Sequence, residues 1–181
     1  MNWFKLGEKS PVCERERMGK FLTSPAITEQ LNKKGMYRVC INELYQDDNG
    51  KIYLVPRGFE TDNFTWINSN DWDTRCSHLH DVGCKYHQVI CVKLNKRQLE
   101  MTRLLHTKHN KVICEDIPVR FLEVIDVSGH WINNLFYRML RDADCPETPK
   151  AIQLLYRVGV AFNIGWFKSG KEKVDLKTIY K

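Results

Sequence analysis

The chain has 181 residues, of which 43% are hydrophobic and 28% charged, and these proportions exclude a disordered or fibrous protein. No apolar run reaches the roughly 18 residues that a transmembrane helix needs, and the N-terminus lacks the apolar stretch of a secretory signal. The formal net charge is +6 with scattered basic residues, which favours solubility or attraction to an anionic surface and gives no strong nucleic-acid signal.

A small β element is predicted over residues 36–69, after an N-terminal extension at 1–35. Apolar segments at 36–41 and 52–55 flank Asp47-Asp48-Asn49-Gly50, which is a strong turn signal. The two segments are therefore expected to pair as a β-hairpin or a small meander.

The end of this β element leads into a loop. Pro56 has no N–H to give to a strand ladder and is expected to end the second strand. Gly58 permits a turn, and Thr61 and Asp62 follow it on the predicted loop.

From residue 70 the apolar pattern becomes helical, which predicts a helical core over 70–166 and a polar tail at 167–181. Helices are expected from Asn70 or Asp71 to about His87, over 95–109, through Trp131 to Leu140, and from Thr148-Pro149 through Phe162. We therefore expect one α+β domain that is mainly helical, with a small β element followed by three to five helices.

The first helix carries His80 followed directly by Asp81. Consecutive helical side chains lie about 100° apart, so the two can line one cavity and have different roles. An imidazole can act as a base near neutral pH, and a carboxylate can bind a hard cation.

The order of motifs around this pair is characteristic. Gly58-Phe59-Glu60-Thr61-Asp62 precedes it, and Ile132-Asn133-Asn134-Leu135-Phe136, Ala151 to Arg157 and Gly159 to Trp166 follow it. From about Tyr37 to Trp166 the chain resembles an uncharacterised phage and prophage family, domain of unknown function number 1353. The same order is similar to that of the prokaryotic and parvoviral phospholipase A-two enzymes, which implies a phospholipase A-two-like helical core.

This resemblance implies roles for individual residues. His80 would be the base, Asp81 and Asp62 would bind calcium, and Asn133 stands where the enzymes have an aspartate that orients the histidine. Glu100, twenty residues after His80, is a rival for the orienting role. Calcium would polarise the ester carbonyl while His80 takes a proton from the attacking water.

The chain also departs from the family pattern. Cys84 occupies the position of an expected tyrosine, and the run Asn63 to Ile67 differs from the usual continuation of the ligand loop. The distance from His80 to Asn133 exceeds that implied by the resemblance, so we expect an insertion near 89–128 that forms a helical excursion outside the core.

Two functions from different classes follow. The first is a calcium-dependent phospholipid acyl hydrolase with weak or lost activity, since a neutral Asn133 cannot stabilise an imidazolium as a carboxylate does. The second is a non-catalytic phage protein that acts as a binding module, a host-factor inhibitor or a virion-structural protein. The expected partner is phospholipid or a host protein, and the expected location is the host cytoplasm or the virion.

A zinc site is a competing interpretation of the same helix. Cys76, His80, Cys84, His87 and Cys91 recur near one side of it, but their spacing does not match that of structural zinc sites. With no secretory signal, the seven cysteines are expected to be reduced, and those of this helix to pack as small apolar groups.

Overall fold

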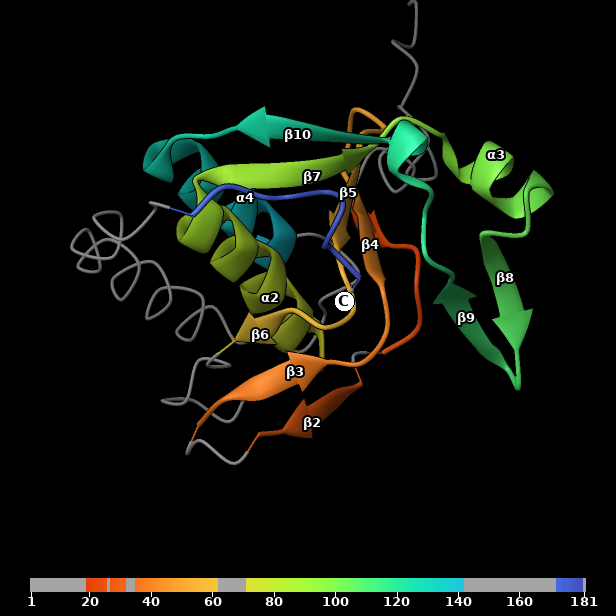
Figure 1. Ribbon diagram of the computed structural model, residues 1–181. Helices are drawn as coiled ribbons and strands as arrows, with labels where there is room; N and C mark the ends of the chain where they lie inside the picture. Colours follow the sequence, from red (N-terminus) through yellow and green to blue (C-terminus); the bar gives the residue numbers. More distant parts are fainter. Residues whose placement is uncertain (1–18, 26, 32–34, 62–70, 142–171, 181) are drawn as a thin grey trace, which may run out of the picture.

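The computed structural model describes residues 19–25, 27–31, 35–61, 71–141 and 172–180, with no side-chain description for 71–73. A five-stranded sheet lies at the centre, and every neighbouring pair of its strands is antiparallel. Its strands, in spatial order, are β1 (Lys20–Phe21), β4 (Glu43–Gln46), β5 (Ile52–Val55), β7 (Gln88–Val92) and β10 (Leu122–Asp126). Figure 1 shows α2 (Asp71–Tyr86) and α4 (Gly129–Arg141) together on one side of this sheet.

The predicted turn is confirmed, but one of its two expected strands is wrong. The turn joins β4 to β5, with Gln46 opposite Ile52. Asp47 organises it, because its Oδ1 accepts the backbone N–H groups of Asn49 and Lys51, and Gly50 has a positive φ of 82°.

The expected first strand of that hairpin, 36–41, belongs instead to a second sheet. This sheet has three antiparallel strands in the order β2 (Thr28–Gln30), β3 (Tyr37–Val39) and β6 (Glu60–Thr61). Between β3 and β4 the chain passes from one sheet to the other at Cys40 to Asn42, where alternation of apolar residues alone cannot show a change of sheet.

The expectation of a mainly helical fold is wrong: the structure is mixed α and β with mostly antiparallel sheets. The predicted helical excursion over 89–128 is also wrong, since β7 lies inside the central sheet and β10 pairs with it along five residues. The remainder of the segment forms α3 (Lys96–Met101), β8 (Leu105–Lys108), β9 (Lys111–Cys114) and the 3-10 turn η1 (Val119–Phe121).

The predicted helix over 95–109 is much shorter in the structure. A capping box between Asn95 and Gln98 begins α3, and the backbone of Arg103 has a positive φ of 58° that a continuing helix does not allow. Leu105 then enters β8, which pairs with β9 as a separate hairpin. In Figure 1 this hairpin and α3 lie on the side of the sheet opposite α2 and α4.

The central sheet is buried on both faces. Alternate residues of β5 and β7 point to different cores: Tyr53, Val55, Val89 and Cys91 pack with the helices, whereas Ile52, Leu54, Ile90 and Val92 pack with the layer of α3 and the β8–β9 hairpin. Residues 172–180 also contact this second core, through Val174, Leu176, Ile179 and Tyr180. Strands buried on both faces have nearly continuous apolar runs, which resemble helical segments when only the sequence is considered.

The two helices that carry the predicted site occur where they were expected. The buried face of α4 consists of Ile132, Leu135, Phe136, Met139 and Leu140, the residues with the predicted helical spacing. The helix expected from residue 148 lies outside the described residues. Among the described residues, no helix is long and apolar enough to cross a membrane.

Candidate functional site

The candidate site lies where α2 packs against α4. His80 on α2 and Asn133 on α4 are 53 residues apart in sequence, and their Nε2 and Oδ1 atoms are 2.9 Å apart. Because an amide oxygen only accepts hydrogen bonds, Nε2 of His80 carries the proton and donates it. The contact therefore fixes the ring so that Nδ1 faces away from α4.

Asp81 lies beside the other ring nitrogen of the histidine. Its Oδ1 is 3.7 Å from His80 Nδ1, and its Oδ2 accepts a hydrogen bond of 2.5 Å from the Thr61 hydroxyl at the end of β6. The group of His80, Asp81, Asn133 and Thr61 thus links α2 to α4 and to the three-stranded sheet.

His80 is nearly enclosed, with 9% of its side chain exposed, and Asp81 has 10% of its side chain exposed. Burial alone lowers the pKa of His80, but the Asp81 carboxylate and the Cys84 thiol beside the ring outweigh it and raise the pKa to about 10. Cys84 Sγ lies 3.5 Å from His80 Nε2. The imidazole is therefore protonated, and positively charged, at neutral pH.

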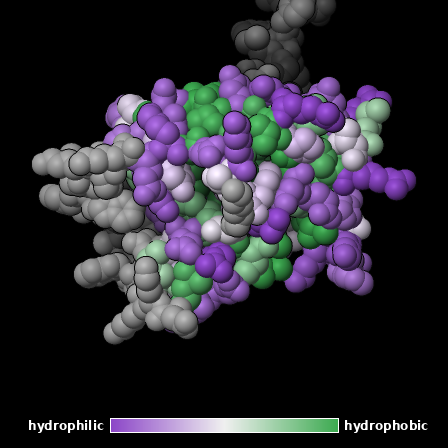
Figure 2. All heavy atoms as spheres, in the orientation of Figure 1, coloured by the Kyte–Doolittle hydropathy of each residue, from purple (hydrophilic) through white to green (hydrophobic). Residues whose placement is uncertain are grey.

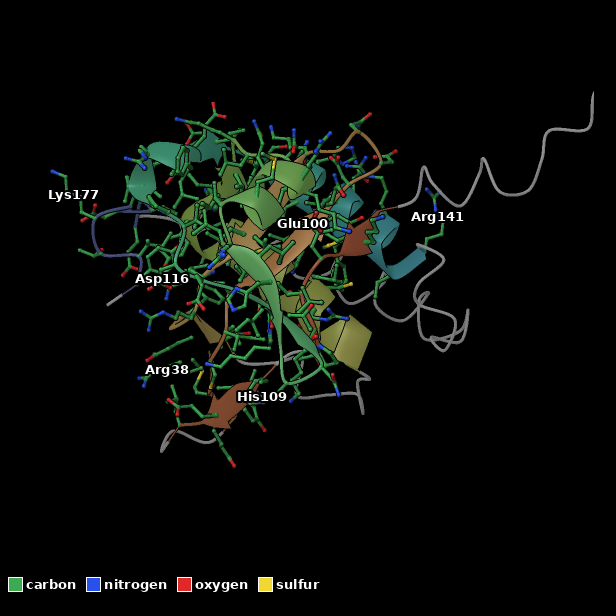
Figure 3. All side chains as sticks on the ribbon, turned by 90° about the vertical axis from the view of Figure 1, so that its right-hand side faces the viewer. Arg38, Glu100, His109, Asp116, Arg141 and Lys177 are labelled. Carbon is green, nitrogen blue, oxygen red and sulfur yellow. The ribbon has the colours of Figure 1, made fainter. Side chains whose placement is uncertain are left out.

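Glu100 lies far from this group. It is on α3, on the opposite side of the central sheet, where its carboxylate is 3.6 Å from Lys96 and half of its side chain is exposed. Figure 3, which views that side, shows Glu100 near the middle of the layer. Of the two rivals for contact with His80, the structure brings Asn133 into place.

A calcium ion at Asp81 would need oxygen ligands from residues that the structure does not describe. Calcium takes six to eight oxygen ligands at about 2.3–2.6 Å. Asp81 has one oxygen occupied by Thr61 and the other directed toward His80, and the described residues contain no group of three or more His, Cys, Asp or Glu able to hold a metal. Asp62, the second expected ligand, lies outside the described residues.

The competing zinc interpretation is not supported by the arrangement of its residues. The helix α2 ends at Tyr86, so Cys91 stands on β7 rather than on the same helix as His80. Burial raises the pKa of Cys91 to about 11 despite the opposing charge of Lys51, which disfavours the thiolate that zinc requires. The cysteines in the described part of the chain are free thiols, and all but Cys40 are buried.

A second polar pair beneath α2 escaped prediction. His78 Nδ1 lies 3.1 and 3.0 Å from the two carboxylate oxygens of Glu43 on β4, and both side chains are fully buried. No role was assigned to His78 from the sequence. The sequence could have indicated this pair only through Glu43, which is a charged residue beside the apolar Leu44 and Tyr45. That indication depends on recognising β4 as a buried strand.

Comparison with known proteins found no relative of this chain. No family model, no curated protein and no solved structure matches the chain.

Proposed function

We propose that this chain carries a phospholipase A-two-like histidine site that hydrolyses phospholipid esters slowly or not at all. The observation that carries the proposal is the 2.9 Å contact between His80 Nε2 and Asn133 Oδ1 across α2 and α4. According to the resemblance, residue 133 corresponds to the aspartate that orients the histidine in the phospholipase A-two enzymes. In this chain the histidine of the enzymes corresponds to His80, and an amide, that of Asn133, stands in place of the carboxylate that orients it.

The chemistry that such a site performs is attack of water on an ester carbonyl. Neutral Nδ1 of His80 would take a proton from the water, and the resulting imidazolium would return it to the leaving alcohol. Asn133 keeps the proton on Nε2 and so holds the reactive tautomer. It cannot, however, stabilise the imidazolium as a carboxylate does.

Two further features support slow rather than rapid hydrolysis. The pKa of His80, raised to about 10, leaves only a small fraction of neutral imidazole at pH 7. The nitrogen that must reach water, Nδ1, faces the Asp81 carboxylate inside a site with little exposure. The expected calcium ligand Asp62 lies outside the described residues, and the steps above are assigned to His80 and Asn133 alone.

The alternative proposal is a non-catalytic binding module, for which a host protein is the proposed partner. A specific observation favours it: the polar groups of the site pair with one another, His80 with Asn133 and Asp81 with Thr61. Groups satisfied in this way act as cross-links among α2, α4 and β6.

The test is fatty-acid release from phosphatidylglycerol and phosphatidylcholine micelles, with calcium and with chelator, by the wild type, Asn133→Asp and His80→Ala. We expect slow or absent hydrolysis by the wild type, at least a roughly tenfold increase in Asn133→Asp, and none in His80→Ala. Asn133→Leu is the matched control, because it has a similar volume and provides no acceptor.

Rapid hydrolysis by the wild type that survives His80→Ala would refute the mechanism. Absence of hydrolysis in the wild type and in Asn133→Asp, with both proteins folded, would favour the binding module. A rate that rises equally in Asn133→Asp and Asn133→Leu would show that loosening of the helix pair, and not the carboxylate, produces the activity.

A further inference from the structure

The layer on the far side of the central sheet, residues 93–121, carries most of the excess positive charge. It contains seven Lys or Arg and three Asp or Glu residues, a formal charge of +4 in a chain of +6. Its three carboxylates are already engaged: Glu100 with Lys96, Glu115 with His106, and Asp116 with Arg57. The carboxylates therefore leave most of the basic residues uncompensated.

Six cations of this layer make no ion pair within the part of the chain that the structure describes, and all six are exposed. They are Lys93, Arg97, Arg103, Lys108, Lys111 and Arg120. Elsewhere the described arginines more often have a carboxylate, as Arg38 has Glu29 and Glu60. Figure 2 shows mostly hydrophilic residues over the side where this layer lies.

The β8–β9 hairpin concentrates this charge at its tip. Lys108 and Lys111 are cross-strand partners at the last position of the ladder, where two like charges directly opposite each other destabilise a hairpin. Between them His109 and Asn110 both have positive φ, 50° and 61°, as in a tight two-residue turn. An anion bound at the tip would relieve the repulsion between the two lysines.

We propose that this hairpin and α3 form a binding surface for double-stranded nucleic acid. A two-stranded β-ribbon fits the major groove, which is about 12 Å wide. The polar side chains of His109 and Asn110 would reach base edges from the tip. Lysines and arginines at the tip and along α3 would contact the phosphates.

A lipid bilayer fits this surface less well. The exposed large hydrophobic side chains of the layer are Met101 and Val119, which are too few for insertion into a membrane interface. The layer also lies across the sheet from His80, so a bilayer bound here would not face the candidate ester-hydrolysing site. The proposed nucleic-acid surface is thus independent of the proposed hydrolase.

The test is fluorescence anisotropy of a labelled DNA duplex of about two helical turns, titrated with the full-length protein at several salt concentrations. Each phosphate contact contributes about −0.9 to the slope of log affinity against log salt, so contacts from all six cations predict a slope of about −5. Lys108→Glu/Lys111→Glu should weaken binding at least roughly tenfold and make the slope less negative by about 2.

The matched control is Arg141→Glu/Lys177→Glu, which changes the net charge by the same amount. Figure 3 shows these two residues at opposite edges of the view, away from the hairpin. The control should bind within about twofold of the wild type, and thermal melts should show that both variants are folded. Equal loss of binding in both variants, unchanged binding by the hairpin variant, or binding of phosphatidylglycerol vesicles without binding of the duplex would each overturn the proposal.

Discussion

Gly83 of α2 lies so close to Ile132 of α4 that no side chain fits between them. A Cβ at residue 83 would be 2.4 Å from Ile132 Cγ1 and 2.6 Å from its Cδ1. Ile132 directly precedes Asn133, and Gly83 is one turn from His80. The close approach that excludes a methyl group at residue 83 is therefore the approach that brings His80 and Asn133 within hydrogen-bonding distance.

Gly83→Ala should destabilise the protein by about 1–2 kcal/mol. Alanine favours a helix over glycine by about 1 kcal/mol, but overpacking a buried contact costs about 1–3 kcal/mol, and the upper part of this range, about 2–3 kcal/mol, applies because Ile132 is fully buried. Urea denaturation measures the difference.

A double-mutant cycle identifies the cause of that loss. Ile132→Ala removes the two atoms that a methyl group at residue 83 would meet. The loss of unfolding free energy caused by Ile132→Ala should therefore be smaller in the Gly83→Ala protein than in the wild type, by at least about 0.5 kcal/mol. A Gly83→Ala protein as stable as the wild type would contradict the predicted clash.

The pKa of His80 should be far above that of an ordinary histidine when its imidazole resonances are followed by NMR across pH. The neighbouring Asp81 and Cys84 outweigh burial and raise it to about 10. Asp81→Asn removes the negative charge and should lower the pKa. A wild-type pKa near 6.5 would contradict the electrostatic description of the site.

The raised pKa also fixes the direction of a stability change. A histidine whose pKa is higher in the folded than in the unfolded state stabilises the folded protein, and this stabilisation is complete below the unfolded-state pKa of about 6.5. Its contribution is then lost as the pH rises toward about 10. The free energy of unfolding should consequently fall between pH 7 and 10, and fall less in Asp81→Asn. An equal fall in both proteins would show that another group is responsible.

Hydrolysis that uses His80 as the base should increase with pH through about 10, because only neutral imidazole accepts a proton. In Asn133→Asp the new carboxylate favours the charged ring, so the rise should shift to higher pH, and the expected gain in rate is that of the plateau reached above the pKa, where the ring is neutral in both proteins. The profile of His80→Ala gives the alkaline background to subtract. A residual rate that is flat between pH 7 and 10 would exclude His80 as the base.

The helices α2 and α4 were predictable from the sequence, whereas the contact between His80 and Asn133 was expected only from the resemblance, with Glu100 as a rival. α4 has one apolar stripe, and the spacing of such a stripe specifies which face is buried. In α2, by contrast, all residues from Arg75 to Cys84 are buried. Asn133 follows Ile132, a core residue of α4, and this places its side chain beside the face that packs on α2. The turn at Asp47 was predictable for a similar reason, because its hydrogen bonds are local.

The strands after α2 were not predictable in the same way. The partners of β7 are β5 and β10, each about thirty or more residues away in sequence, and its apolar residues face two different cores. The basic layer was missed for a related reason. Lys93 and Arg120 are far apart in sequence, and they become neighbours only because Lys93 follows β7 and Arg120 precedes β10.

The buried pair of Glu43 and His78 should contribute far more to stability than an exposed pair. Both side chains are fully enclosed, and His78 Nδ1 lies 3.1 and 3.0 Å from the two carboxylate oxygens. Glu43→Leu removes one partner of this buried pair, a change that costs about 3–5 kcal/mol. Glu100→Leu, which removes the exposed pair with Lys96, should cost about 0.5 kcal/mol or less. Chemical denaturation of both variants measures the two costs, and similar small losses in the two would show that the buried contact adds little to the fold.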